Sequence, residues 1–287
     1  MKEDAISADE KPHLVVLAGP GLGDFYVLGG DDVVLGNDPF HADMVVRDID
    51  VEPRHAEIRQ EPRSGEYILR GLVPERVVSV NGVSLGGGGN GHKLSEGDRI
   101  SLGDSILEFS RDPVWASFHH ELHRLINLDY LTGLLAKNRF DEEFEHYLEQ
   151  ARLQKFPVST LMADIDNLKK INDAHGHLLG EFVVGEIGRI IGEVHEEEGR
   201  QATRFGGDEY QTCLPHLTKP EAREIAEEVR RRVETYPFER DGATVAPTLS
   251  LGVATCPEDG TTRAELTRAA DEALYRAKRA GGNTVSL

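Results

Sequence analysis

The chain contains 287 residues, of which 32 are Lys or Arg and 51 are Asp or Glu, so its formal net charge at pH 7 is −19. A chain of this length predicts two domains. So negative a charge repels nucleic acids and anionic lipid surfaces, and we expect neither as a partner. Two cysteines are too few for a disulfide framework, and neither a secretory leader nor an apolar run of about 18 residues is visible. We therefore expect a cytoplasmic protein without a membrane span.

Residues 1–12 form a polar tail that we expect to be disordered, and residues 13–111 predict an antiparallel β-sandwich. Short runs rich in Val, Ile and Leu are separated there by Gly, Asp and Asn, and no helical period is visible. Regular short strands with turn residues between them are typical of all-β sandwiches.

The order of motifs in this region resembles a forkhead-associated (FHA) domain, a phosphothreonine-binding sandwich. The resemblance covers about residues 14–110, and its matching segments are 34–36, 42–46, 54–58, 80–82 and 94–100. It implies a regulatory domain whose ligand is a phosphorylated peptide or protein. The chain's own tail is one candidate ligand, because Ser7 would gain the required charge if a kinase modified it.

The phosphate-contacting positions match this family less well than the scaffold does. Asn37 stands where the family has Arg, Glu52 where it has Ser, and Arg76 where it has Asn. A phosphate dianion needs cations and donors, which Arg54 and Arg76 supply and Glu52 opposes. Arg54, Arg76 and Asn37 are the expected phosphopeptide contacts, and a degenerate domain that binds protein without phosphate stays open as the alternative.

Residues 112–127 predict a helical signalling linker between the two domains. Apolar side chains recur in it at steps of three and four, as in the a and d positions of a short coiled coil: Trp115, Phe118, Leu122 and Leu125. Such a stripe either packs on one domain or dimerises the chain and sets how two catalytic domains face each other. His119 and His123 lie four residues apart, but without a third ligand nearby we do not expect zinc.

Two acidic corners stand out in residues 128–287. The apolar run 157–163 predicts a buried strand that ends at Asp164, and a helix is expected to begin with Asp166 or Asn167 as its N-cap. The second corner is Gly206-Gly207-Asp208-Glu209, whose glycines suit a tight hairpin turn with positive φ.

If these corners are neighbours in one sheet, Asp164, Asp208 and Glu209 can gather around Mg²⁺, or Mn²⁺ in its place. Alone, each corner has a simpler interpretation, since Gly-Gly-Asp-Glu is more often an ordinary hairpin and Asp-Ile-Asp more often a helix cap. Further motifs that follow in order favour the metal site.

The C-terminal half resembles a GGDEF domain, the catalytic domain of diguanylate cyclases. The resemblance covers about residues 125–287 and is carried by segments 129–139, 164–181, 206–210, 249–254 and 270–278. It implies an α+β, palm-like nucleotide-cyclase fold, with helices around an antiparallel-rich central sheet, over residues 128–287.

This resemblance implies that two GTP molecules, one on each protomer of a homodimer, are condensed into cyclic di-GMP with release of two pyrophosphates. It implies metal ligation by Asp164, the backbone carbonyl of Ile165, Asp208 and Glu209. Asp208 is also the expected acceptor of the attacking hydroxyl's proton.

The resemblance places the substrate around this metal site. Asn172 and Glu181 are the expected guanine readers, because an amide and a carboxylate match the donors and acceptors of the base. His177 either lines this pocket or only braces the helix–loop turn. The β- and γ-phosphates are expected at the amides near Leu168 and at the side chains of Lys169 and Lys278.

Several positions depart from the family pattern. Tyr210 replaces Phe, Glu181 replaces Asp, and Gly282 replaces an Arg that would bind phosphate. Residues 197–200 read Glu-Glu-Gly-Arg in place of the Arg-x-x-Asp of the product-inhibition site, so Glu197 should repel the product and we expect no standard product inhibition. Because of Gly282, a catalytically silent signalling adaptor that binds GTP or a cyclic dinucleotide is the alternative function.

Overall fold

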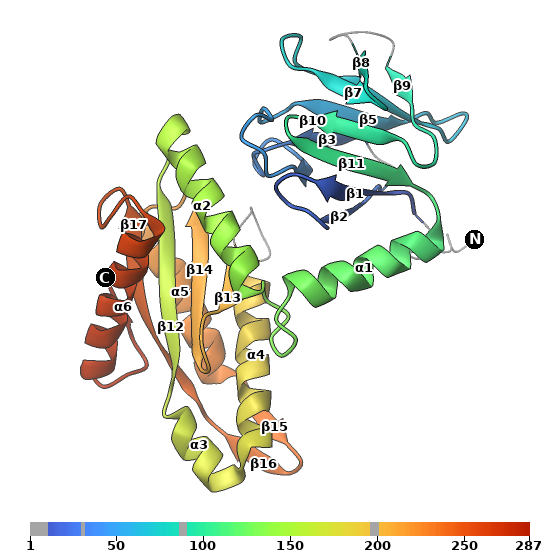
Figure 1. Cartoon of the computed structure of the whole chain (residues 1–287). Helices are drawn as coiled ribbons and strands as arrows, with labels where there is room; N and C mark the ends of the chain where they lie inside the picture. The colour runs from blue at the N-terminus through green and yellow to red at the C-terminus, as the bar shows by residue number, and fades with distance from the viewer. Residues whose placement is uncertain (1–10, 30–31, 86–90, 196–200) are drawn as a thin grey trace. The chain divides into compact units, whose positions relative to one another are not determined.

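The structure is a computed structural model, and it describes residues 11–29, 32–85, 91–195 and 201–287. The chain divides into two compact units, which meet between Ile126 and Asn127 (Figure 1). Ser7 and residues 197–200 lie outside the described residues, so the expectations that rest on them stay predictions.

The N-terminal unit is a β-sandwich, as the sequence predicted. One sheet has the strand order β2 (Phe25–Val27), β1 (His13–Ala18), β11 (Ser105–Ser110), β10 (Arg99–Leu102), β7 (Val78–Val80), β8 (Val83–Leu85). The other has the order β4 (Met44–Val45), β3 (Val33–Gly36), β5 (Ala56–Gln60), β6 (Tyr67–Gly71), β9 (His92–Lys93). Leu14 and Leu107 of the first sheet share one core with Leu35 and Leu69 of the second, which joins the two layers.

Helix α1 (Pro113–Asn127) follows β11 and has two unlike faces within this unit. On one face Ala116 is 1% exposed, and His123 Nε2 lies 3.7 Å from the buried carboxylate of Asp24. On the other, Trp115, Phe118 and Leu125 are 53%, 56% and 68% exposed. Three members of the predicted apolar stripe are thus exposed, and the fourth, Leu122, is half-buried.

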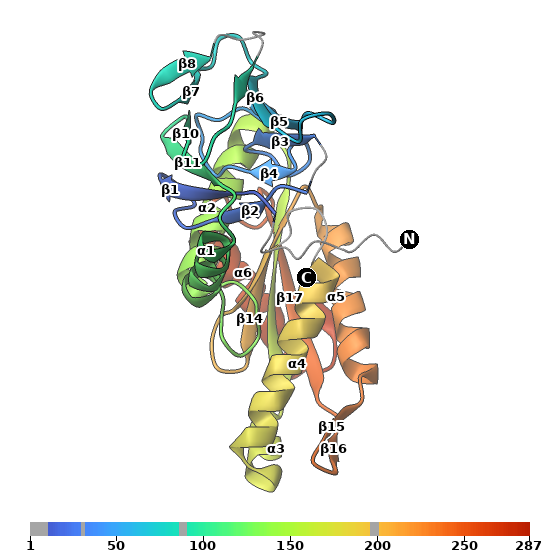
Figure 2. The ribbon, with the colours of Figure 1, turned by 90° about the vertical axis from the view of Figure 1, so that its right-hand side faces the viewer.

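The C-terminal unit is built on a five-stranded sheet with helices on both faces (Figures 1 and 2). The strand order is β13 (Gln201–Arg204), β14 (Glu209–Pro215), β12 (Val158–Asp166), β17 (Thr248–Cys256), β18 (Val285–Ser286). All neighbours are antiparallel except β17 and β18. The helices are α2 (Lys137–Gln154), α3 (Leu168–His175), α4 (His177–His195), α5 (Lys219–Thr235) and α6 (Arg263–Arg279), and β15 (Phe238–Arg240) pairs with β16 (Ala243–Val245). The predicted α+β architecture is confirmed.

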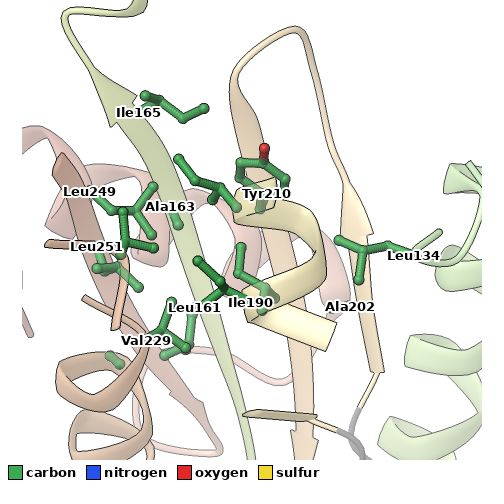
Figure 3. Packing of buried hydrophobic residues seen from close by; sticks show 14 of the residues in the cluster. Leu134, Leu161, Ala163, Ile165, Ile190, Ala202, Tyr210, Val229, Leu249 and Leu251 are labelled. Atoms are coloured by element: carbon green, nitrogen blue, oxygen red, sulfur yellow. The ribbon is translucent and has the colours of Figure 1, made fainter. Parts of the chain in front are cut away.

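Alternate residues of β12 enter two different cores. Leu161 and Ala163 pack with α4 and α5 residues such as Val183 and Val229, as Figure 3 shows for part of this cluster. Met162, between them, packs with α2 and α6 residues that include Phe140. Because both faces are covered, β12 is buried from Val158 to Ala163, and only Ser159 and Thr160 interrupt its apolar residues there.

The last three residues of β12 carry two carboxylates, Asp164 and Asp166. The N-cap of α3 is Asn167, one of the two predicted residues, and it adopts φ 57° without a capping hydrogen bond from its side chain. Asp166 remains the last residue of β12. The carboxylates that follow the buried run are therefore held by a strand that is fixed on both faces.

Candidate active site

Two strand ends bring the predicted metal-binding carboxylates together. Asp164 of β12 pairs directly with Glu209 of β14 in the antiparallel register. One residue further along, the Ile165 N–H donates to the Asp208 carbonyl oxygen at 3.1 Å. Residues about 45 positions apart in the sequence thus meet at one edge of the sheet, as the two acidic corners predicted.

The hairpin that carries Asp208 is held from its side. The Arg204 guanidinium donates to the Gly207 carbonyl oxygen through Nε at 3.1 Å and Nη2 at 2.8 Å, and its Nη1 lies 4.0 Å from Asp129. Asp129 in turn accepts hydrogen bonds from the Thr132 N–H and hydroxyl. This chain of contacts links the start of the unit to the hairpin, and the motif alone did not predict it because Asp129 lies 75 residues before Arg204 in the sequence.

The two glycines of the hairpin behave differently from the prediction. Gly206 and Gly207 are both described, and neither has positive φ. At Gly206 a Cβ would lie 2.9 Å from Glu209 Oε2. The missing side chain therefore makes room for a carboxylate at this position, and the expected left-handed turn was wrong.

The carboxylates of this site are crowded and partly buried. Burial raises the pKa of Asp164 above its usual value; the ion pair with Lys278 opposes that rise, and the nearby Asp208 and Asp166 add to it. Burial likewise raises the pKa of Glu209, with further contributions from Asp164, Asp208 and Asp271. Repulsion between like charges in a partly desolvated site has this effect. The site therefore favours any added positive charge.

Lys278 of α6 supplies one such charge, because its ammonium group forms an ion pair with Asp164 Oδ1. In residues 11–29, 32–85, 91–195 and 201–287, no three His, Cys, Asp or Glu side chains are arranged to hold a metal ion. The donors nevertheless fit Mg²⁺ or Mn²⁺, which prefer carboxylate and carbonyl oxygen, here from Asp164, Asp208, Glu209 and the Ile165 carbonyl. The Lys278 pair shows that a cation is accommodated beside Asp164.

A cavity of about 470 Å³ opens beside these residues. Asp164, Glu209 and Lys278 line it together with α6 residues that include Tyr275 and Arg276. Arg276 was not among the predicted site residues, and its Nη2 also donates to the Leu287 carbonyl oxygen at 2.8 Å. The cavity is thus lined by two basic side chains, Lys278 and Arg276, and by the α6 carboxylates of Asp271 and Glu272 besides Asp164 and Glu209.

Asp166 holds the loop that contains Gly282, the residue that replaces the Arg of the family pattern. Its carboxylate accepts hydrogen bonds from the Thr248 hydroxyl at 2.8 Å, the Ser250 hydroxyl at 2.7 Å and the Asn283 N–H at 2.9 Å. Gly282 has φ +79°, and a Cβ there would lie 3.1 Å from the Asp166 carboxylate. An Arg at position 282 would thus be strained in this loop, so the glycine matches its surroundings.

The predicted guanine readers lie on α3 and α4. A Cβ on Gly180 would stand 1.8 Å from Asn172 Oδ1, so this glycine leaves room for the Asn172 side chain between α3 and α4. Asn172 Oδ1 is buried without a hydrogen-bond partner in the described structure, an acceptor that a base could satisfy. Glu181 and His177 are exposed.

The remaining predicted substrate contacts lie on α3, where Leu168 is buried and Lys169 is exposed. Among the described contacts, no hydrogen bond or ion pair joins the guanine readers to the carboxylates. The roles of all these residues stay predictions.

Tyr210, which replaces the Phe of the motif, is fully buried below the hairpin. Its hydroxyl donates to the Val184 carbonyl oxygen at 2.8 Å, and burial raises its pKa far above the usual value. The extra hydroxyl has therefore found a partner inside the core, which makes the replacement a conservative one.

The predicted phosphopeptide contacts of the N-terminal unit all have protein partners. Arg54 Nη1 donates to the His41 carbonyl oxygen at 3.2 Å, and Arg76 Nε donates to Glu52 Oε1 at 2.8 Å. Asn37 is 5% exposed. None of the described hydrogen bonds joins these three residues to one another.

Comparisons with known proteins identify the family of each unit. The family model for the diguanylate cyclase GGDEF domain matches residues 126–284, more than half of the chain, and the FHA-domain model matches residues 33–103. None of the described helices is both long and apolar enough to cross a bilayer.

Similar proteins include diguanylate cyclase A of Treponema denticola, which is 32% identical over 58% of this chain and 46% of its own length. The response regulator PleD of Caulobacter vibrioides is 35% identical over 55% of this chain and 35% of its own length. The chain thus spans less than half of these curated relatives. The solved GGDEF domain of DgcB from Caulobacter crescentus, in complex with c-di-GMP, is 30% identical with a TM-score of 0.52, over 56% of this chain and 94% of that one.

The raised pKa of Asp164 predicts that its negative charge lowers the stability of the folded protein. Because the folded pKa exceeds the unfolded one, ionised Asp164 opposes folding at neutral pH, and this cost fades as the pH falls through the raised pKa. Asp164→Asn should therefore raise the melting temperature at neutral pH without divalent cations, and the gain should shrink in acid.

The matched change is Asp166→Asn, which should lower the melting temperature because an acceptor oxygen becomes an NH₂ group facing three donors. Calorimetric melting of both variants checks the prediction. An equal loss of stability in Asp164→Asn would show that its ion pair with Lys278 outweighs the crowding.

Proposed function

Because the chain belongs to the GGDEF diguanylate cyclase family, we propose that it condenses two GTP molecules into cyclic di-GMP and two pyrophosphates across a homodimer. The proposal rests on the convergence of Asp164, Asp208 and Glu209 at the ends of β12 and β14. A ligand of the FHA-like domain regulates the reaction.

In each half-reaction the 3′-hydroxyl oxygen of one GTP forms a bond to the α-phosphorus of the other. The bond from that phosphorus to the bridging oxygen breaks, and pyrophosphate leaves with its electron pair. Asp208 accepts the hydroxyl proton. When bound, Mg²⁺ or Mn²⁺ polarises the phosphate and lowers the pKa of the hydroxyl. Asp164, Glu209 and the Ile165 carbonyl are its proposed ligands beside Asp208.

The proposed substrate contacts follow the two sides of the site. Asn172 and Glu181 orient guanine, with His177 at the rim of their pocket. The triphosphate binds to Lys169 and Lys278 and to the amides near Leu168. Lys278 has a double task, since it neutralises Asp164 before the substrate arrives and turns to the phosphates afterwards. Arg276 supports the same side, where Gly282 leaves the family's arginine missing.

Two opposed active sites require a dimer, and we propose that α1 supplies it. Its exposed stripe of Trp115, Phe118 and Leu125 has the spacing of a coiled-coil seam. Two such helices side by side would bury the stripe and set the distance between the catalytic units.

The proposed regulatory ligand is a phosphorylated segment of another protein or of the chain's own tail, at Ser7. Arg54, Arg76 and Asn37 are its proposed contacts. A cytoplasmic location, where GTP is plentiful, suits this function.

The first prediction of this proposal concerns Asp208. Asp208→Asn should lower cyclic di-GMP formation from Mg²⁺ and GTP at least about a hundredfold, because the proton acceptor and a metal ligand are lost together. Asp241→Asn, a matched change at a side chain that is 92% exposed, should leave the rate unchanged. Product is measured by chromatography over a range of protein concentrations, and the wild-type rate per protomer should rise with concentration.

No cyclic dinucleotide from wild type with either Mg²⁺ or Mn²⁺, at any protein concentration, would contradict the enzyme. Saturable GTP binding under those conditions would then favour the catalytically silent adaptor. Gly282, which stands where the family has a phosphate-binding Arg, is the reason for this alternative.

The second prediction concerns the α1 stripe. Phe118→Glu should shift the dimer toward monomer in sedimentation and lower the rate per protomer about tenfold, because two charges would face each other in the seam. Ser117→Glu adds the same charge on another exposed side of the helix and should change neither property. A Phe118→Glu variant that stays as dimeric as wild type would place the interface elsewhere.

A further inference from the structure

The N-terminal unit contains a pocket of about 270 Å³ beside β7 and β10 of the first sheet. Its walls include Arg76, Asp50 and His55, and the hydroxyl-bearing Ser79 and Ser101. The two serines are direct partners in the register of β7 and β10, so they stand side by side. An arginine and two serines that line one pocket can together supply donors suited to an oxyanion.

The guanidinium of this pocket is already bound by an anion of the same chain. Arg76 Nε donates to Glu52 Oε1 at 2.8 Å, and Arg76 Nη1 lies 4.0 Å from Asp50 Oδ1. The side chains of Arg76 and Glu52 are 43% and 38% exposed, so the pair lies at the solvent edge of the pocket. An exposed pair of this kind contributes little stability, and another anion can replace it.

Two backbone hydrogen bonds hold Glu52 at its place beside Arg76. The Glu52 N–H donates to His55 Nδ1 at 3.0 Å, and its carbonyl oxygen accepts from the Asn37 N–H at 3.1 Å. These bonds involve no atom of the Glu52 carboxylate. The Glu52 side chain can therefore be substituted without breaking the hydrogen bonds that hold the loop.

We propose that Glu52 is a built-in competitor for the anion site at Arg76, and that it sets the affinity of this domain for a phosphomonoester side chain. The inference rests on the regulatory half of the proposed function. A phosphorylated ligand must displace the Glu52 carboxylate before it reaches Arg76.

Charge and geometry favour a phosphomonoester over a carboxylate in this exchange. A phosphate dianion carries more charge than Glu52 and has three acceptor oxygens, enough for the guanidinium and the serine hydroxyls together. Against this, Asp50 and Glu52 both repel it. Burial lowers the pKa of His55, so the imidazole adds no positive charge at neutral pH. Wild-type binding should consequently be weak and should strengthen when Glu52 loses its charge.

The test is a titration of the full chain with N-acetyl-O-phosphothreonine amide, followed by the amide resonances of Ser79 and Ser101. Glu52→Gln should bind this probe about tenfold more tightly than wild type, because competition and repulsion are both removed. Arg76→Gln should abolish the shifts, and N-acetyl-threonine amide should cause none. Dispersed amide spectra show that each variant is folded.

Glu108→Gln is the matched control, because Glu108 also pairs with an exposed arginine, Arg99, at 3.3 Å in the same unit. An equal gain in Glu108→Gln, unchanged affinity in Glu52→Gln, or equal shifts with unphosphorylated threonine would overturn the inference. If wild type binds the probe but Glu52→Gln gains nothing, phosphate-dependent regulation survives without this role for Glu52. If neither wild type nor Glu52→Gln binds the probe, phosphate recognition by this domain is overturned as well. GTP turnover is measured separately, and neither binding result changes its interpretation.

Discussion

Repulsion among carboxylates at the ends of β12 and β14 is the constraint on which the rest of the catalytic unit depends. The strand register places Asp164 opposite Glu209, and the Ile165–Asp208 hydrogen bond keeps Asp208 beside them. Burial is the main cause of the raised pKa of Asp164 and of Glu209, and the repulsion raises both further. A strand pair with no other purpose would gain stability by losing one of these acids, so their presence together points to a cation that the site is built to receive.

The surrounding fold keeps this crowded site in place. Two cores, one on each face of β12, prevent the strand from relaxing, and Asp166 ties its end to β17 and to the loop at Asn283. Arg204 holds the hairpin from the other side. Lys278, which pairs with Asp164, has a long flexible side chain, and in the proposed mechanism it moves to the substrate phosphates when another cation binds. The N-terminal unit contains a similar ion pair that a ligand must break. Glu52 pairs with Arg76, and in our proposal a phosphate dianion displaces the Glu52 carboxylate.

Local patterns in the sequence predicted much of this arrangement. The apolar run before Asp164, the N-cap at Asn167 and the acidic hairpin depend on neighbouring residues, and the ordered motifs identified the family. Contacts between residues far apart in the sequence could not be predicted. No local pattern indicates that Lys278 pairs with Asp164 or that Arg76 pairs with Glu52. The hairpin glycines show a subtler failure. Their flexibility suggested positive φ, which neither adopts, and a Cβ at Gly206 would instead lie 2.9 Å from the Glu209 carboxylate.

The most direct test of the central claim is the number of protons released when Mn²⁺ binds together with a non-hydrolysable GTP analogue. Calorimetric titrations in buffers of different protonation enthalpy measure this number. If crowded carboxylates with raised pKa values receive the cation, protons should be released in mildly acidic buffer, fewer should be released as the pH rises, and Glu209→Gln should reduce the release. Tight binding of Mn²⁺ and the analogue with no proton release at any pH, or with release unchanged in that variant, would contradict the account.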